Sequence, residues 1–85
     1  MKKYPDIEIK EITVCIKEIK GSIFNTYDFI DMWCIKYPKS YNNFASIGIG
    51  WKRMVGKNLS KNAGKFSYFV MLHGKKNGAQ LWQKY

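Results

Sequence analysis

The chain has 85 residues, which make one small domain and leave little room for a buried catalytic pocket with its supporting residues. Apolar residues make up 46% of it and aromatic residues 16%, which excludes a disordered chain. All six Asp and Glu residues lie at or before Asp31, so the net charge of +9 belongs to the C-terminal part. Such a one-signed half attracts a polyanion.

The sequence shows no signal for a membrane or for export. No apolar run approaches the ~18 to 20 residues of a membrane span. The first ten residues also lack the apolar core of a signal peptide. We therefore expect an intracellular, cytoplasmic protein with no membrane contact.

The first predicted element is a helix over residues 6–20. Isoleucines recur along it at intervals of three or four residues, at Ile9, Ile12, Ile16 and Ile19. Asp6 can cap its start, and Gly21 is a natural stop. Alternating β-branched residues within 12–16 leave a strand as the alternative, but the terminal signals fit only a helix.

A short extended piece, residues 22–24, leads to a second predicted helix from Thr26 to Lys36. Asn25 or Thr26 can cap this helix, and Pro38 ends it because the residue before a proline resists helical geometry. Apolar side chains recur at helical spacing, at Ile30, Trp33, Cys34 and Tyr37. The pattern is that of an amphipathic helix.

A third helix is predicted from Tyr41 to Asn58. Its core side carries Phe44, Ile47, Trp51, Met54 and Val55. Gly48, Gly50 and Gly56 weaken this prediction, because glycine destabilises a helix interior. The alternative is that residues 46–50 form a loop and the helix begins near Trp51.

From Phe66 onward the apolar period becomes two, which predicts two strands, one over 66–73 and one around 81–82. Asn77-Gly78 between them is the signal of a tight hairpin turn, since both residues accept positive φ. The hairpin tip, 74–78, is dibasic.

The two cysteines are Cys15 and Cys34, and both fall on apolar helical faces. We expect buried free thiols rather than a disulfide. A zinc site needs about four ligands, and besides these cysteines the chain offers the single His73. We therefore expect no metal and no cofactor.

This order of a helix, a short strand, two helices and a basic hairpin resembles a winged helix-turn-helix domain. The resemblance covers residues 6–85. It implies an α+β fold in which residues 1–85 form one domain of three helices, a short strand and a C-terminal β-hairpin wing. It also implies that the helix over 41–58 enters the major groove, that the wing contacts the DNA backbone or minor groove, and that strand 22–24 joins the hairpin.

The outer face of the third predicted helix carries candidate base contacts in line with one another. These are Asn42, Ser46, Ile49 and Arg53. Arg53, the one arginine of the chain, can grip two acceptors of a guanine edge. Asn42 can pair with adenine, Ser46 with a base or phosphate, and Ile49 can meet a thymine methyl.

Candidate phosphate contacts come from the same helix, from the segment that follows it and from the hairpin. They are Lys52, Lys57, Lys61, Lys65, Lys75, Lys76 and, at the tip, Asn77. Lysine suits phosphate as a point charge, and affinity follows the number of phosphates neutralised.

Pairing across the predicted turn sets Lys76 opposite Ala79 and His73 opposite Trp82. One face of the hairpin is assigned to the core, with Tyr68, Val70, Leu72 and Leu81. The other face carries Phe69, Met71 and Trp82. We expect this apolar face to be partly exposed and to bind a second copy or a protein partner.

The sequence thus predicts a small basic protein that binds duplex DNA, as a transcriptional regulator or a mobile-element factor. RNA or single-stranded DNA are alternative ligands. The alternative class is a protein-interaction module, or a small inhibitor or subunit of a nucleic-acid-processing complex, with the same fold. We do not expect an enzyme, because the basic half has one histidine and no carboxylate for acid–base chemistry.

Overall fold

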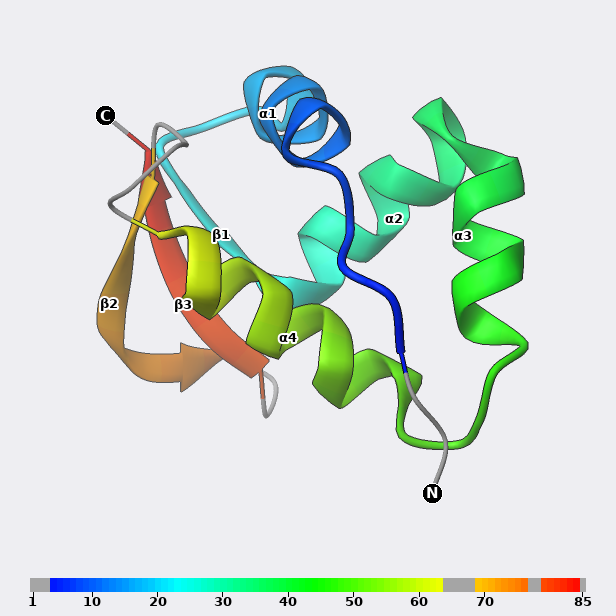
Figure 1. Cartoon of the computed structure of the whole chain (residues 1–85). Helices are drawn as coiled ribbons and strands as arrows, with labels where there is room; N and C mark the ends of the chain where they lie inside the picture. Colours follow the sequence, from blue (N-terminus) through cyan, green and yellow to red (C-terminus); the bar gives the residue numbers. More distant parts are fainter. Residues whose placement is uncertain (1–3, 64–68, 77–78, 85) are drawn as a thin grey trace.

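The computed structural model describes the backbone of residues 4–63, 69–76 and 79–84, and the side chains of all of these except 69–76. The elements in chain order are α1 (Ile9–Glu18), β1 (Ile23–Asn25), α2 (Thr26–Lys36), α3 (Pro38–Ala45), α4 (Trp51–Asn62), β2 (Phe69–Lys76) and β3 (Ala79–Lys84). The strands form an antiparallel sheet at one end of the molecule, and α3 lies at the other end (Figure 1). The α+β class is as predicted, but the described residues form four helices rather than three.

The first helix is shorter than predicted at both ends. Glu8 occupies the N-cap position without a side-chain hydrogen bond, and Asp6 does not cap the helix. Ile12, Cys15 and Ile16 are buried, as the helical spacing predicts. The helical interpretation of this segment is confirmed, and the strand alternative is wrong.

The second helix has the predicted bounds, and its start is fixed by a capping box. The backbone N–H of Asp28 donates to Asn25 Oδ1 at 2.8 Å, and the backbone N–H of Asn25 donates to Asp28 Oδ2 at 2.9 Å. Asn25 is therefore the cap, and Thr26 is the first helical residue. Strand β1 ends at this cap residue, so no loop separates the sheet from α2.

The prediction of one continuous helix over 41–58 is wrong, and the alternative, with a loop over 46–50, is confirmed. The chain leaves the helix after Ala45 and returns to it at Trp51. Gly48 and Gly50 flank Ile49, whose side chain is fully exposed, so burial offers nothing to offset the helical cost of two glycines. Pro38 does more than end α2, because it is also the first residue of α3.

The sheet has the order β1-β3-β2, with β3 in the middle. Phe24 of β1 lies opposite Trp82, and the strand lies one residue later than the predicted 22–24. Lys76 lies opposite Ala79, as predicted. The turn residues Asn77 and Gly78 lie outside the described residues.

The hairpin register changes between Met71 and Lys75, so Met71 and not His73 lies opposite Trp82. The predicted pairing of His73 with Trp82 is therefore wrong. An irregularity of this kind inserts unpaired residues into one strand, and Gly74 lies within it. Alternation alone carries no information on where such an insertion falls.

The predicted exposure of Trp82 is also wrong, because its side chain is 1% exposed and belongs to the core. Its Nε1–H donates to Thr26 Oγ1 at 3.1 Å, so the buried polar group has a partner. Leu81, assigned to the core, is only half-buried. The side chains of Phe69, Met71, Val70 and Leu72, and all of Tyr68, lie outside the described part.

The helical end of the core is built around Trp33, whose ring packs against Phe44 and Tyr41 edge to face. Its Nε1–H donates to Glu11 Oε1 at 2.8 Å, which joins α1 to α2. Phe29, which the predicted stripe omitted, is also fully buried beside it. No helix in the described part of the chain is long and apolar enough to cross a membrane.

Both cysteines are free thiols, but they differ in burial. Cys15 is buried, whereas Cys34 is half-buried and so less enclosed than predicted. Burial, reinforced by the Glu11 carboxylate and opposed by Lys36, raises the pKa of the Cys15 thiol to about 12. Its reactive thiolate is therefore scarce at neutral pH.

We expect a thiol reagent in mildly alkaline buffer to label Cys34 of the native protein and to reach Cys15 only on unfolding. The reason is the enclosure and raised pKa of Cys15. Time-resolved labelling with and without denaturant measures this. A Cys34→Ser variant is the control, and rapid labelling of that native variant would contradict the prediction.

Candidate nucleic-acid interface

Helix α4 has two faces of opposite character. Its inner face carries two fully buried apolar side chains, Val55 and Leu59, and two buried amides, Asn58 and Asn62. The outer face lines a cleft, with Lys52, Arg53, Gly56, Lys57 and Ser60. These five positions repeat at i, i+1, i+4, i+5 and i+8, which is one side of an α-helix.

The cleft has a volume of about 670 Å³ and lies between α4, the first turn of α2 and strand β3. We call it the α4 cleft. Its lining comprises Thr26, Tyr27, Lys52, Arg53, Gly56, Lys57, Ser60, Ala79, Gln80 and Trp82. Three of these residues are cationic and none is acidic. The described surface here suits an anion with several hydrogen-bond acceptors.

The ammonium group of Lys52 lies within cation–π distance of two aromatic rings. Its Nζ lies 5.6 Å from the ring centroid of Tyr27 and 5.7 Å from that of Trp51. Trp51 is itself packed edge to face against Tyr41. Cation–π attraction therefore restrains this charge at the cleft without neutralising it.

The first turn of α2 forms the inner wall of the cleft. Thr26 is buried, and its hydroxyl oxygen accepts the hydrogen bond from Trp82. Gly56 faces it from α4, since a Cβ atom at this position would lie 4.0 Å from Thr26 Oγ1. Three elements thus meet at one point of the cleft.

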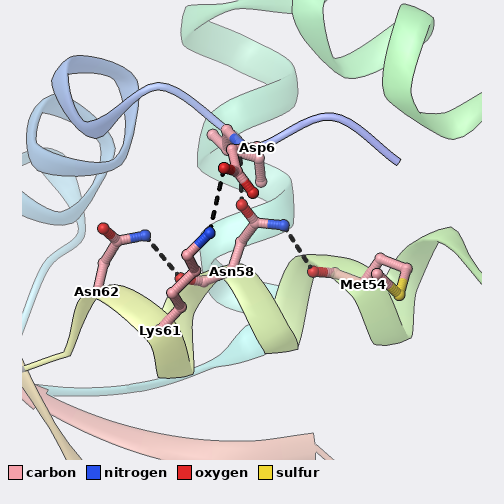
Figure 2. Close-up of polar contacts among 6 residues, drawn as sticks. Asp6, Met54, Asn58, Lys61 and Asn62 are labelled. Atoms are coloured by element: carbon pink, nitrogen blue, oxygen red, sulfur yellow. Dashed lines mark hydrogen bonds and ion pairs between the residues drawn. The ribbon is translucent and has the colours of Figure 1, made fainter. Parts of the chain in front are cut away.

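The inner face of α4 is tied to the segment before α1 by buried hydrogen bonds. The backbone N–H of Ile7 donates to Asn58 Oδ1 at 2.9 Å, and Asn58 Nδ2 donates to the Met54 carbonyl at 2.9 Å. Asn62 Nδ2 donates to the Asn58 carbonyl at 2.8 Å. Figure 2 shows these amides on α4 below the N-terminal segment. They orient α4 so that its cationic face points into the cleft.

The side chain of Lys61, a predicted phosphate contact, points toward the segment before α1 and not into the cleft. Its Nζ lies 3.1 Å from Asp6 Oδ2, in an exposed ion pair (Figure 2). It is not part of the cleft lining. The structure therefore separates Lys61 from Lys52, Arg53 and Lys57.

The predicted line of base contacts is broken by the loop over 46–50. Asn42 lies exposed on α3, and Ser46 ends that helix, with its hydroxyl donating to the Asn43 carbonyl at 2.9 Å. Ile49 lies in the loop itself and is 103% exposed. Of the four residues, only Arg53 lies on α4 and in the cleft. The predicted alignment is wrong because it assumed one continuous helix.

The remaining predicted residues lie on the hairpin or between the described segments. Lys75 and Lys76 belong to β2, where the backbone alone is described. Lys65 and Asn77 lie outside the described residues. Trp82 lines the cleft from within the core and presents no exposed apolar surface.

Sequence reasoning missed six cleft residues, namely Thr26, Tyr27, Gly56, Ser60, Ala79 and Gln80. The positions on α4 follow from helical spacing once the helix is started at Trp51. Tyr27 and Gln80 have no comparable signal, because only the tertiary fold brings α2 and β3 to the same place.

A second hollow, of about 260 Å³, lies on the other side of the molecule beside α1. It is lined in part by three carboxylates, Asp6, Glu8 and Glu11. Glu11 is already engaged, since it accepts hydrogen bonds from Trp33 and Ser40. Its charge makes this hollow unsuited to a polyanion, and the described residues contain no cluster fit to hold a metal ion.

Comparison with known proteins returned no match among protein-family models, curated protein sequences or solved structures. The functional interpretation therefore follows from the geometry and charge of the α4 cleft.

We expect Asn58→Ala to lower the free energy of unfolding by about 1 to 3 kcal/mol, because the buried N–H of Ile7 loses its acceptor. Urea denaturation measures this loss. Lys61→Ala is the control on the same helix, and its exposed ion pair should contribute less than about 1 kcal/mol. Equal losses for the two variants would show that the amide does not anchor α4.

Proposed function

We propose that this protein is a small winged-helix DNA-binding protein in which α4 and the hairpin face the duplex. The observation that carries the proposal is the α4 cleft, where Lys52, Arg53 and Lys57 project from one helix face with no carboxylate among the lining residues. A cationic surface of this kind supplies the sequence-independent part of DNA affinity. We further propose a role in transcription regulation or in a mobile element.

The topology supports the winged-helix interpretation. A short strand lies between α1 and α2, and it pairs with the strand that ends the hairpin, giving the order β1-β3-β2. The hairpin is the next described element after α4, an order that supports our proposal that α4 is the recognition helix. Helix α3 is additional to the three-helix pattern, and the loop after it sets where α4 begins.

Duplex DNA is favoured over single strands by the placement of the aromatic rings. Binding of unpaired bases uses aromatic side chains on which bases stack. Among the residues with described side chains, Tyr27 is the most exposed aromatic residue, at 41%. Lys52 lies over its ring, so a base would have to displace the ammonium group.

The alternative function is a protein-interaction module, and it rested on an exposed apolar face made by Phe69, Met71 and Trp82. Burial of Trp82 removes one of these three residues from the surface. The α4 cleft does not replace that apolar face, because three of its ten lining residues are cationic and none is acidic. DNA binding is therefore the function that we propose.

We expect the affinity for duplex DNA to fall steeply with salt, with a slope of about −0.9 in log K against log salt for each phosphate neutralised. Lys57→Ala should reduce the slope by about one, because it removes one phosphate contact. Fluorescence anisotropy over a range of salt concentrations measures this slope.

Lys20→Ala is the matched control, because it removes the same charge from a hollow that contains Asp28 and Asp31 instead of the cleft. It should leave the slope unchanged. Equal effects of the two variants would mean that net charge alone drives binding. Absence of binding even at low salt would refute the proposed function.

We expect Arg53→Ala to weaken binding to a selected site more than binding to random duplex. A lost bidentate contact with a guanine costs about 1 to 3 kcal/mol of discrimination, whereas a lost phosphate contact is blind to sequence. Site selection from a random library, followed by competition titrations, provides the two affinities. An equal loss on both duplexes would assign Arg53 to the backbone.

A further inference from the structure

We propose that one sugar–phosphate strand of the bound DNA enters the α4 cleft, where a phosphate oxygen accepts a hydrogen bond from the Thr26 hydroxyl, and that Gly56 leaves the room for it. This inference rests on the proposed function and adds the position of one strand. It assigns a ligand contact to Thr26 and gives Gly56 the role of keeping that contact accessible.

The first observation is a buried hydroxyl with hydrogen-bonding capacity to spare. Thr26 is 6% exposed, and its Oγ1 accepts from Trp82 Nε1 at 3.1 Å. The bond from the indole uses a lone pair and leaves the hydroxyl hydrogen to donate. Within the described part of the chain, no acceptor takes that hydrogen. Buried donors are normally paired, so an acceptor that enters the cleft would complete this site.

The second observation is a glycine that neither backbone conformation nor packing requires. Gly56 lies in the interior of α4, where glycine costs up to about 1 kcal/mol relative to alanine. Gly21 is the glycine with positive φ among the described residues, so Gly56 has no such need. An added Cβ would lie 4.0 Å from Thr26 Oγ1, which is an ordinary contact distance.

A longer side chain at position 56 would therefore extend over the Thr26 hydroxyl and into the cleft. Glycine keeps the path to this donor open, at a cost to helix stability. Close approach of a ligand to the backbone is a common reason for glycine at such a position.

The charges around this point suit a phosphodiester. Lys52 lies one helical turn before Gly56, Lys57 is the next residue, and Ser60 lies one turn after it, all in the cleft lining. A volume of about 670 Å³ falls in the range of small-ligand sites, roughly 300 to 1,000 Å³. It cannot hold a duplex, so a duplex can place only a segment of one backbone inside it.

The experiment compares duplex affinity, by anisotropy, for three variants of the full chain. Gly56→Met fills the cleft with a good helix former, Gly56→Ala adds only the Cβ, and Gln83→Met places methionine on β3 outside the cleft. We expect Gly56→Met to bind about tenfold or more weakly, since it blocks a hydrogen bond to a charged group. Gly56→Ala should bind with an affinity between those of the wild type and Gly56→Met, because its Cβ narrows the path to Thr26 without closing it. Gln83→Met should bind within about twofold of the wild type, because it leaves the charged contacts and the cleft unchanged.

Thermal unfolding accompanies each titration, and both substitutions of Gly56 should leave the melting temperature at or above that of the wild type. If Gly56→Met fails to fold, Ser60→Met fills the other end of the same cleft from an exposed position. Tight DNA binding by folded Gly56→Met or Ser60→Met would overturn the inference and leave the proposed function standing. Absence of DNA binding by the wild type would instead refute the proposed function.

Discussion

The buried indole of Trp82 joins the sheet to the helices, and the α4 cleft depends on this junction. Trp82 sits on the central strand, opposite Phe24 of β1 and Met71 of β2. Its Nε1–H reaches the hydroxyl of Thr26 at the start of α2. Because β1 runs directly into the capping box of α2, this one side chain sets the distance between the hairpin and the helix that forms the inner wall of the cleft.

The second constraint is the division of charge along the chain. In the described residues the acidic side chains serve the N-terminal half: Glu18 pairs with Lys36, Asp28 caps α2, and Glu11 accepts from Trp33. Asp6 is the exception, because it forms an exposed ion pair with Lys61 of α4, outside the cleft lining. The cations on the outer side of α4 meet no carboxylate in the cleft, so their field remains available to an external anion.

Much of the fold was predictable because it depends on local chemistry. The bounds of α2 follow from Asn25, Asp28 and the proline after the helix, all of which act within a few residues. The pairing of Lys76 with Ala79 likewise follows from a turn signal between them. The start of α4 was less certain, because glycines and helical periodicity over 46–50 give opposite signals.

The candidate site was predictable only in part. Helical spacing, counted from Trp51, places Lys52, Arg53 and Lys57 on one face, whereas the line that included Asn42, Ser46 and Ile49 required a helix that the loop interrupts. Tyr27 and Gln80 enter the site through packing of α2 and β3 against α4. Such contacts join residues far apart in the chain, and periodicity does not encode them.

The sequence by itself determined the α+β class, the position of α2, and a C-terminal half whose charge is one-signed, because these depend on composition and near neighbours. Only the tertiary structure decided which side of the hairpin is buried. Enclosure of the indole in the core cluster and its bond to Thr26 place Trp82 in the core. That side chain is buried by residues far from it in the sequence, which local sequence patterns do not specify. The same packing brings Thr26 and Gly56 together with Lys52, Arg53 and Lys57 at one cleft.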